Sequence, residues 1–246
     1  MQRLLSPAER LIVAADFKPV APNGREWVKA QVLNLADSLK GTGVYLKVNS
    51  ALRACGYDLI DEIHSRGLKV FADLKLYDIG ETLSTDGVLL RQFKPDLLTT
   101  VCVAGVTAMQ ALKAELPDTE VLGVTVLTSL KLVDTQEMFR ATMEASVMKF
   151  ALLAEAAGVD GLICAPTDIA FIQSVVKRPM TFNTPAIRPT WAIVPGDDQN
   201  PDLIMTPAKA IKAGADRIVV GRPITQDKNP YDAVMRTIKE ITAAMA

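Results

Sequence analysis

The chain is organised around one run of residues, Phe71-Ala72-Asp73-Leu74-Lys75-Leu76-Tyr77-Asp78-Ile79-Gly80-Glu81-Thr82. Apolar residues just before it indicate a buried strand, and helix-forming residues follow it. Asp73 and Lys75 are two residues apart, so at a strand end their side chains point to the same side of the sheet. Charges in so apolar a setting are unfavourable unless they pair with one another or with a ligand. The run therefore predicts an active site.

The overall composition is ordinary for a water-soluble protein. Of 246 residues, 49% are apolar and 22% charged, which is ample for a core. Lys and Arg number 27 against 28 Asp and Glu, so charge gives no reason to expect nucleic acid or an anionic membrane as a partner. Residues 1–7 carry no apolar signal region, and no run reaches membrane-spanning length. We expect a cytoplasmic protein.

Cysteine and histidine are sparse. Cys55, Cys102 and Cys164 are widely spaced and odd in number, so we expect buried thiols in a reducing compartment. His64, the one histidine, lies in a polar helix end and is expected to be solvated. No His/Cys cluster has metal-ligand spacing, and no Ser-His-Asp or Cys-His arrangement is present. Carboxylates alone can hold Mg²⁺, but the neighbouring lysines disfavour it. The residues therefore give no reason to expect a metal.

Apolar strands alternate with helices along the whole chain. The expected strands are residues 10–16, 43–48, 67–76, 96–103, 121–127, 161–164, 180–184 and 217–221. The expected helices are residues 26–39, 51–65, 82–92, 107–116, 134–157, 167–177, a short helix that begins at Thr206-Pro207, and residues 229–246. Gly67 and Gly158 are expected to end the second and fifth helices.

Eight such units without a linker predict a closed (β/α)₈ TIM barrel that forms a single domain over residues 1–246. The alternative, an open doubly wound sheet, would be expected to carry a glycine-rich turn after its first strand, and Asp16-Phe17-Lys18-Pro19 is not one. The proline-rich loop of residues 185–205 is long for a compact domain and is predicted to be a lid.

Charged and polar residues gather where the expected strands end, which is where such barrels place their active sites. They are Asp16, Lys47, Asp73, Lys75, Asp78, Thr128, Arg188 and Arg222. One such charge is explained equally well by a surface ion pair, but alternating charges from the first three units favour a site. Gly221-Arg222 after the last strand, with Arg188 in the preceding loop, predicts a phosphate site.

At this point the chain resembles the orotidine 5′-phosphate decarboxylase family. Asp73-Leu74-Lys75-Leu76-Tyr77-Asp78 is similar to its Asp-x-Lys-x-x-Asp signature, which sugar-phosphate decarboxylases and aldolases of the same barrel group share. Further likeness runs along essentially the whole chain, in Val13-Ala14-Ala15-Asp16, Leu46-Lys47-Val48, Val124-Thr125-Val126-Leu127-Thr128-Ser129, Ile187-Arg188-Pro189, Ile204-Met205-Thr206-Pro207 and Val219-Val220-Gly221-Arg222-Pro223-Ile224-Thr225. The ordered set is far more specific than the signature alone.

The resemblance implies cofactor-independent decarboxylation of orotidine 5′-phosphate to uridine 5′-phosphate, the last step of pyrimidine synthesis. Lys75 would protonate C6, Asp73 would lie against the substrate carboxylate, and Lys47 and Asp78 would complete the charged array. It further implies a homodimer with shared sites, in which Asp78, Ile79 and Thr82 serve the neighbouring barrel. The remaining substrate-binding residues implied are Asp16, Thr128, Ser129, Pro185, Arg188, Gln199 as the lid glutamine, Gly221 and Arg222.

The chain also departs from the family pattern. Ala186 stands where glycine is usual, which restricts positive φ. Asn49 stands where glycine is common, and the first loop and residues 191–203 are longer than usual. The nearest rivals are Mg²⁺-dependent sugar-phosphate enzymes of the superfamily, 3-keto-gulonate-phosphate decarboxylase and hexulose-phosphate synthase. A further alternative is a barrel that binds nucleotides without turnover.

Overall fold

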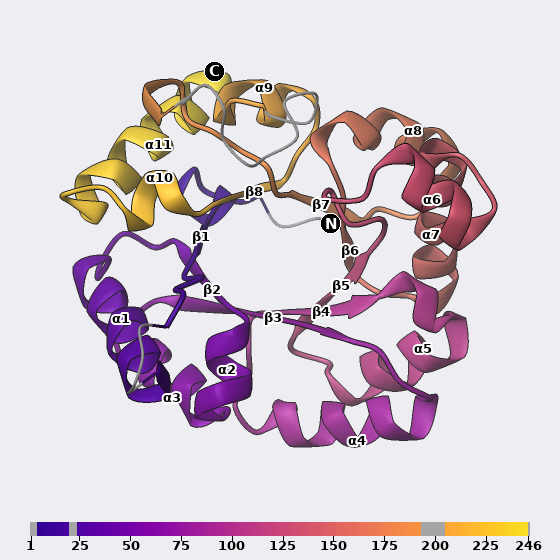
Figure 1. The fold of residues 1–246 in the computed structure, drawn as a ribbon, viewed down its shortest axis with the longest axis horizontal. Helices are drawn as coiled ribbons and strands as arrows, with labels where there is room; N and C mark the ends of the chain where they lie inside the picture. Colours follow the sequence, from indigo (N-terminus) through magenta and orange to yellow (C-terminus); the bar gives the residue numbers. More distant parts are fainter. Residues whose placement is uncertain (1–3, 20–23, 193–204, 246) are drawn as a thin grey trace.

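Eight parallel strands close into a barrel in chain order, and helices surround it (Figure 1). The computed structural model describes residues 4–19, 24–192 and 205–245. The strands are β1 (Leu11–Ala14), β2 (Tyr45–Val48), β3 (Lys69–Leu76), β4 (Leu97–Val101), β5 (Glu120–Val124), β6 (Gly161–Ile163), β7 (Thr181–Thr184) and β8 (Arg217–Val220). β1 pairs with β8, which closes the ring, and the prediction of a (β/α)₈ barrel is confirmed.

Helices follow each strand, some of them short. Among the described residues they are α1 (Gly24–Ser38), α2 (Ser50–Cys55), α3 (Asp58–His64), α4 (Gly80–Arg91), α5 (Val106–Glu115), α6 (Leu132–Phe139), α7 (Met143–Ala157), α8 (Ile169–Val175), α9 (Pro207–Lys212), α10 (Arg222–Thr225) and α11 (Pro230–Met245). Single 3₁₀ turns are η1 (Ala8–Arg10), η2 (Cys102–Ala104), η3 (Pro166–Asp168) and η4 (Thr190–Ala192). Thr206 caps α9 as predicted, because its hydroxyl accepts from the Lys209 N–H at 3.3 Å.

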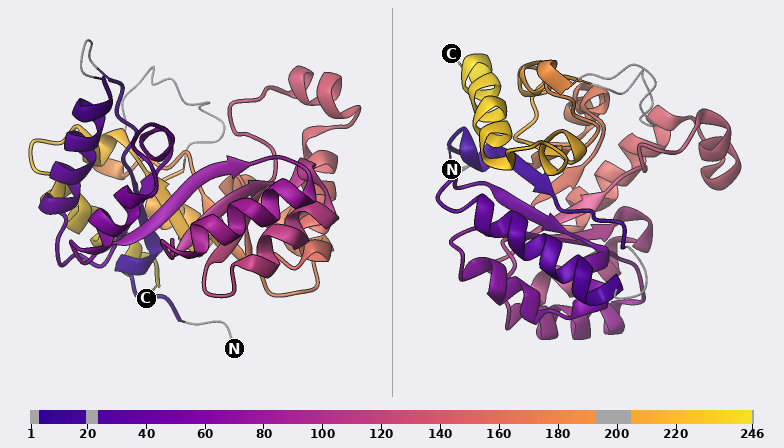
Figure 2. Two further views of the ribbon diagram at one scale, coloured as in Figure 1. Left: turned by 90° about the horizontal axis from the view of Figure 1, so that it is seen from below. Right: turned by 60° about the vertical axis from the view of Figure 1, so that its left-hand side comes forward.

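Two helices that were predicted to be continuous are each divided into two. Residues 51–65 form α2 and α3, separated where Gly56 adopts φ 86°. Residues 134–157 form α6 and α7, separated where Arg140 adopts φ 55° and the Thr142 hydroxyl caps α7. The second break turns α6 away from the barrel, and this helix stands clear of the ring of helices (Figure 2).

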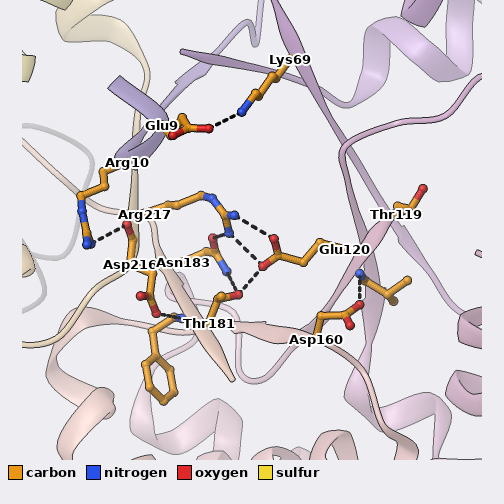
Figure 3. A network of polar contacts seen from close by, with 12 residues as sticks. Glu9, Arg10, Lys69, Thr119, Glu120, Asp160, Thr181, Asn183, Asp216 and Arg217 are labelled. Atoms are coloured by element: carbon orange, nitrogen blue, oxygen red, sulfur yellow. Dashed lines mark hydrogen bonds and ion pairs between the residues drawn. The ribbon is translucent and has the colours of Figure 1, made fainter. Parts of the chain in front are cut away.

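The barrel interior is layered. Its middle is apolar and comprises Ile12, Tyr45, Phe71, Leu97 and Leu122. At the amino-terminal ends of the strands Arg217 forms an ion pair with Glu120 at 2.7 Å and donates to Asn183 at 3.1 Å (Figure 3). The apolar layer thus separates this polar cluster from the opposite mouth, where the predicted site lies. A larger apolar core fills the space between the strands and the helices.

The structure corrects two smaller expectations. All three cysteines are free, and burial raises the pKa of the Cys102 and Cys164 thiols, but Cys55 is only half-buried. His64 is half-buried rather than solvated, with Nε2 at 3.1 Å from Asp96 Oδ2. Among the described residues, no helix has the length and apolar character needed to span a bilayer.

Candidate active site

A cavity of about 880 Å³ opens at the carboxyl ends of the strands, where the sequence places the site. Its wall includes nine of the predicted residues, which are Asp16, Lys47, Asp73, Lys75, Thr128, Pro185, Arg188, Gly221 and Arg222. They follow or end six different strands, so the closed barrel brings together residues as far apart in sequence as Asp16 and Arg222.

An unbroken chain of ion pairs crosses one side of this cavity. Lys47 Nζ lies 2.8 Å from Asp16 Oδ2 and 3.2 Å from Asp73 Oδ2. Lys75 Nζ lies 2.7 Å from both oxygens of Asp73. Lys47 and Asp73 are 7% and 6% exposed, whereas Lys75 reaches further into the open cavity. Positive and negative groups therefore alternate in the order Asp16, Lys47, Asp73, Lys75.

Mutual pairing keeps the buried members of this array ionised. Burial alone would raise the pKa of Asp73, but the ammonium groups of Lys47 and Lys75, with hydrogen bonds from Lys75 and Thr99, hold that pKa below its usual value. Burial would likewise lower the pKa of Lys47, yet Asp73 and Asp16 raise it above the usual range. The array is thus a fixed set of charges set into an apolar barrel, the arrangement that electrostatic catalysis requires.

A distortion of β3 brings Lys75 into this array. Ala72 pairs with Leu98 of β4, but Leu76 pairs with Thr100, so β3 advances four residues over a stretch in which β4 advances two. Within this bulge Lys75 adopts φ 49°, a left-handed angle that is uncommon for residues other than glycine. Asp73 and Lys75 share one side of the sheet as predicted, but the bulge, rather than regular alternation alone, sets where Lys75 points.

The floor and far wall of the cavity are apolar. They include Phe71, Val124, Ile163 and Val219, which come from four strands, and Cys164 just after β6. A flat, uncharged group can rest on such a floor with one edge against the charged array. Thr128 adds a hydroxyl on the β5 side.

Two arginines occupy the β7–β8 side of the cavity. Arg188 is buried, its guanidinium donates to the Ile187 carbonyl at 3.2 Å, and its own N–H donates to Met205 O at 2.9 Å. Arg222 begins α10 directly after Gly221, whose missing side chain leaves the backbone open to the cavity. Ala186, beside Arg188, adopts φ 63°, so the alanine does hold the left-handed conformation that glycine would adopt freely.

Five predicted residues are not brought to this cavity by the described structure. Asp78, Ile79 and Thr82 follow β3, all three are exposed, and none of them lines the cavity. Ser129 is exposed and does not line the cavity, although Thr128 beside it does. Gln199 lies outside the described residues, as does most of the loop predicted to be a lid.

Besides the apolar floor, sequence reasoning missed several further residues of the cavity wall, among them Phe17, Lys18, Trp27, Thr225 and Gln226. Phe17 and Trp27 meet edge to face, with their ring centroids 6.4 Å apart. Phe17 and Lys18 directly follow Asp16, and Thr225 and Gln226 follow Arg222 at helical spacing, so their nearness to predicted residues was a usable signal. Trp27 gave none, because it lies within α1.

The fold and the site together define a (β/α)₈-barrel enzyme. Its third strand supplies Asp73 and Lys75 to one side of the cavity, and two arginines lie on the β7–β8 side. Sequence comparison identifies the group within this class. A sequence profile of the Orotidine 5'-phosphate decarboxylase / HUMPS family matches residues 9–237, and the chain belongs to that family.

Individual members of this family are similar to the chain over almost its whole length. The chain is 36% identical to the orotidine 5'-phosphate decarboxylase of Rhodopseudomonas palustris, over 96% of both proteins. It is 33% identical to that of Afipia carboxidovorans, over 97% of both. The crystal structure of orotidine 5'-phosphate decarboxylase from Lactobacillus acidophilus superimposes with a TM-score of 0.77 at 27% identity, covering 95% of this chain and 99% of that one.

Proposed function

We propose that this protein decarboxylates orotidine 5′-phosphate to uridine 5′-phosphate, the last step of pyrimidine nucleotide synthesis, without a cofactor. Membership of the family supports the reaction class. The observation that carries the proposal is the Asp16–Lys47–Asp73–Lys75 chain of ion pairs beside an apolar floor. Such an array suits a substrate with a flat base, an ionised carboxyl group at its edge, and a remote phosphate.

In the proposed reaction the bond between C6 and the carboxylate carbon breaks, and carbon dioxide leaves. The electron pair stays on C6, and Lys75 Nζ donates a proton to it, after which the amine takes a proton from water. Lys75 suits this role because its ammonium group reaches into the cavity while Asp73 fixes its position at 2.7 Å. Asp73 would face the departing carboxylate, and Lys47 would hold Asp73 and Asp16 in place.

Substrate binding would use the rest of the wall. Asp16 would accept a hydrogen bond from a ribose hydroxyl, and Thr128 and Pro185 would contact the base. Arg188, Arg222 and the open backbone at Gly221 would hold the phosphate. Binding energy from this remote phosphate can hold the base against the charged array. Gln199 and Ser129 remain predicted contacts from the closed lid and the β5 loop.

A homodimer with shared sites is the second part of the proposal. Tyr77 and Ile79 after β3 are 66% and 70% exposed, and Val103 after β4 and Leu127 after β5 are 48% and 45% exposed. Because these strands are neighbours, the apolar side chains gather on one sector of the rim beside the cavity. A second copy that covers this sector would bring its Asp78, Ile79 and Thr82 to the neighbouring cavity. A cytoplasmic location fits such an enzyme and remains a prediction.

The decisive experiment mixes the purified protein with orotidine 5′-phosphate and follows the loss of substrate absorbance. Wild type is expected to turn over, and Lys75→Ala is expected to lose at least about 10³-fold in kcat, because no other group is proposed to supply the proton. Absence of turnover by wild type would sink the proposal. Near-normal turnover by Lys75→Ala would remove Lys75 from its role.

Chelation separates this activity from the metal-dependent sugar-phosphate enzymes of the same family. Among the residues that the structure describes, no group of three or more His, Cys, Asp or Glu side chains is arranged to hold a metal ion. We expect full activity in EDTA. Loss of activity in EDTA, with recovery on adding Mg²⁺, would favour the sugar-phosphate class.

A further inference from the structure

Behind the charged array lies a buried hydroxyl that contacts both Asp73 and Lys75. Thr99 is in β4, its side chain is fully buried, and it does not line the cavity. Its Oγ1 donates to Asp73 Oδ1 at 2.9 Å and accepts from the Lys75 backbone N–H at 2.9 Å. We propose that Thr99 is a positioning residue that fixes the Asp73 carboxylate and the Lys75 backbone for the decarboxylation proposed above, on which this role rests.

The direction of both hydrogen bonds is determined by chemistry. The backbone N–H of Lys75 can only donate, and the ionised carboxylate of Asp73 can only accept. A hydroxyl has one hydrogen to donate and lone pairs to accept with, so Thr99 satisfies both partners at once. Valine has the same shape and offers neither function. Removing the hydroxyl would therefore leave a backbone N–H without its partner and one carboxylate oxygen held by lysine alone.

The position of this hydroxyl matters because of the bulge in β3. At Lys75 the chain has left regular pairing with β4 and holds φ 49°. Such a conformation persists only where surrounding contacts hold it. The Thr99 hydroxyl replaces the missing strand hydrogen bond at this residue, and the angle it stabilises is the one that directs the Lys75 ammonium toward Asp73. Thr99 thus links the backbone strain to the position of the proton donor.

The neighbouring threonine provides a matched control. Thr100 is also fully buried in β4, and its hydroxyl donates to Leu76 O at 2.9 Å, outside the charged array. Thr99→Val and Thr100→Val each remove one buried hydroxyl from adjacent positions of one strand. If Thr99 only supported the fold, the two variants would behave alike.

We expect Thr99→Val to lower kcat on the order of 10- to 100-fold, as loss of a hydrogen bond to a charged group implies. KM should stay within about threefold, because the phosphate contacts are untouched. Thr99→Ser retains the hydroxyl, so its kcat should lie within about threefold of wild type. The kcat of Thr100→Val should also lie within about threefold of wild type. Equal kcat for the two valine variants, or equal damage by valine and serine at 99, would overturn the proposal.

Amide hydrogen exchange gives a readout that does not depend on activity. In the substrate-free protein the Lys75 amide should exchange about tenfold faster in Thr99→Val than in wild type, and at the wild-type rate in Thr100→Val. If wild type does not turn over the substrate, the proposed reaction fails, and this measurement still decides whether Thr99 holds Lys75. Unchanged Lys75 exchange overturns the positioning role. Should Thr99→Val not fold, Thr99→Ala removes the same hydroxyl and takes its place.

Discussion

Two residues of the cavity wall hold left-handed backbone angles although neither is glycine. Lys75 has φ 49° and Ala186 has φ 63°. The Lys75 N–H donates to the Thr99 hydroxyl, and the side chain of Lys75 is the one that we propose as the proton donor. Ala186 has no comparable role for its methyl group, although its carbonyl accepts from the Met205 N–H at 3.4 Å. We therefore expect the strain at Ala186 to be removable without loss of activity, whereas that at Lys75 belongs to the proposed proton donor.

Ala186→Gly is expected to stabilise the protein by about 0.5–1 kcal/mol, since glycine adopts this angle freely and the relief exceeds its extra unfolded-state entropy. Denaturant unfolding measures the change. Ala165→Gly is the control, because Ala165 is also buried but has φ −66°. That variant should lose stability, since glycine gains nothing at a negative angle. Destabilisation by both substitutions to a similar degree would contradict strain at Ala186.

The ion pair between Glu9 and Lys69 makes stability depend on pH at the amino-terminal end of the barrel. Glu9 Oε1 lies 2.5 Å from Lys69 Nζ, and the hydrogen bond from Lys69 lowers the pKa of Glu9 from 4.5 to about 2. Because the pKa of Glu9 is lower in the folded state, the ion pair stabilises the protein at pH values above the pKa of the unfolded state. This stabilisation is lost as the pH falls through the pKa of the folded state.

Wild type should therefore exceed Glu9→Gln in free energy of unfolding at neutral pH, and the difference should shrink between pH 4.5 and about 2. Denaturant unfolding across this range measures it. In a Lys69→Met background the same substitution should show a much weaker pH dependence. An unchanged dependence there would mean that Lys69 is not the cause.

Residues that chemistry requires were easier to predict than residues that support them. Asp73 and Lys75 stand out because charges are rare in a buried strand, and family resemblance adds to that signal. Thr99 could not be selected this way, because threonine is common in strands and its partners lie on β3. Only the register of β3 against β4, with its bulge, brings the three together.

At the scale of elements, one device joins the strands of the barrel in pairs. An aspartate stands just before each of β4, β6 and β8, and its carboxylate accepts from a backbone N–H near the start of the preceding strand. The three bonds, each 2.8 Å long, are Asp96 to Val70, Asp160 to Val121 and Asp216 to Phe182. In each pair the aspartate N–H donates back to the carbonyl of the same residue. These reciprocal contacts fix the register of three strand pairs.

Asp160 is the best place to test this device. Its carboxylate also forms an ion pair with Lys113 at 2.6 Å, and Val121 is fully buried. Asp160→Ala should lower the free energy of unfolding by about 1–3 kcal/mol, because the Val121 N–H loses its acceptor. Asp160→Asn keeps an acceptor oxygen and loses only a partly exposed ion pair, so its effect should stay below about 1 kcal/mol. Equal losses in denaturant unfolding would show that the ion pair alone matters.

The sequence was enough to predict which segments form strands and which form helices, but it did not reveal the breaks within two of the helices. Alternation of apolar strands and helices was enough for the barrel because each unit is long and periodic. The break after α6 depends on a left-handed arginine, which has no distinctive sequence signal. Gly56 between α2 and α3 was visible, but helical spacing continues across it. Tertiary packing decides such points.

At the scale of the whole molecule, Asp78 is the residue that a single barrel leaves unexplained. It is exposed, and its carboxylate accepts from the Ile79 N–H at 2.7 Å. Burial, together with repulsion from Asp78, raises the pKa of Asp86. Two carboxylates close together on a rim with exposed apolar side chains suit a surface that meets cationic groups of another copy. Lys75 of a second copy, which reaches into the open cavity, would provide such a group.

Mixing two inactive variants tests whether sites are shared. Asp73→Asn and Asp78→Asn chains should each form inactive homodimers. A mixed dimer would contain one site with both substitutions and one site with neither. Random mixing should therefore restore about a quarter of wild-type activity, because half of the dimers are mixed and each has one intact site. Two different affinity tags allow the mixed dimers to be isolated and counted.

Asp73→Asn mixed with Lys75→Ala is the matched control, because both residues serve their own barrel. Every site in that mixture carries one substitution, so no activity should return, even though the same surfaces meet. Recovery of activity in this control would mean that each chain contributes more than the segment after β3 to the site of its neighbour. If tagged Asp73→Asn/Asp78→Asn dimers form and stay inactive, Asp78 does not act across the interface. The exposed segment of residues 78–82 would then need a role within its own barrel.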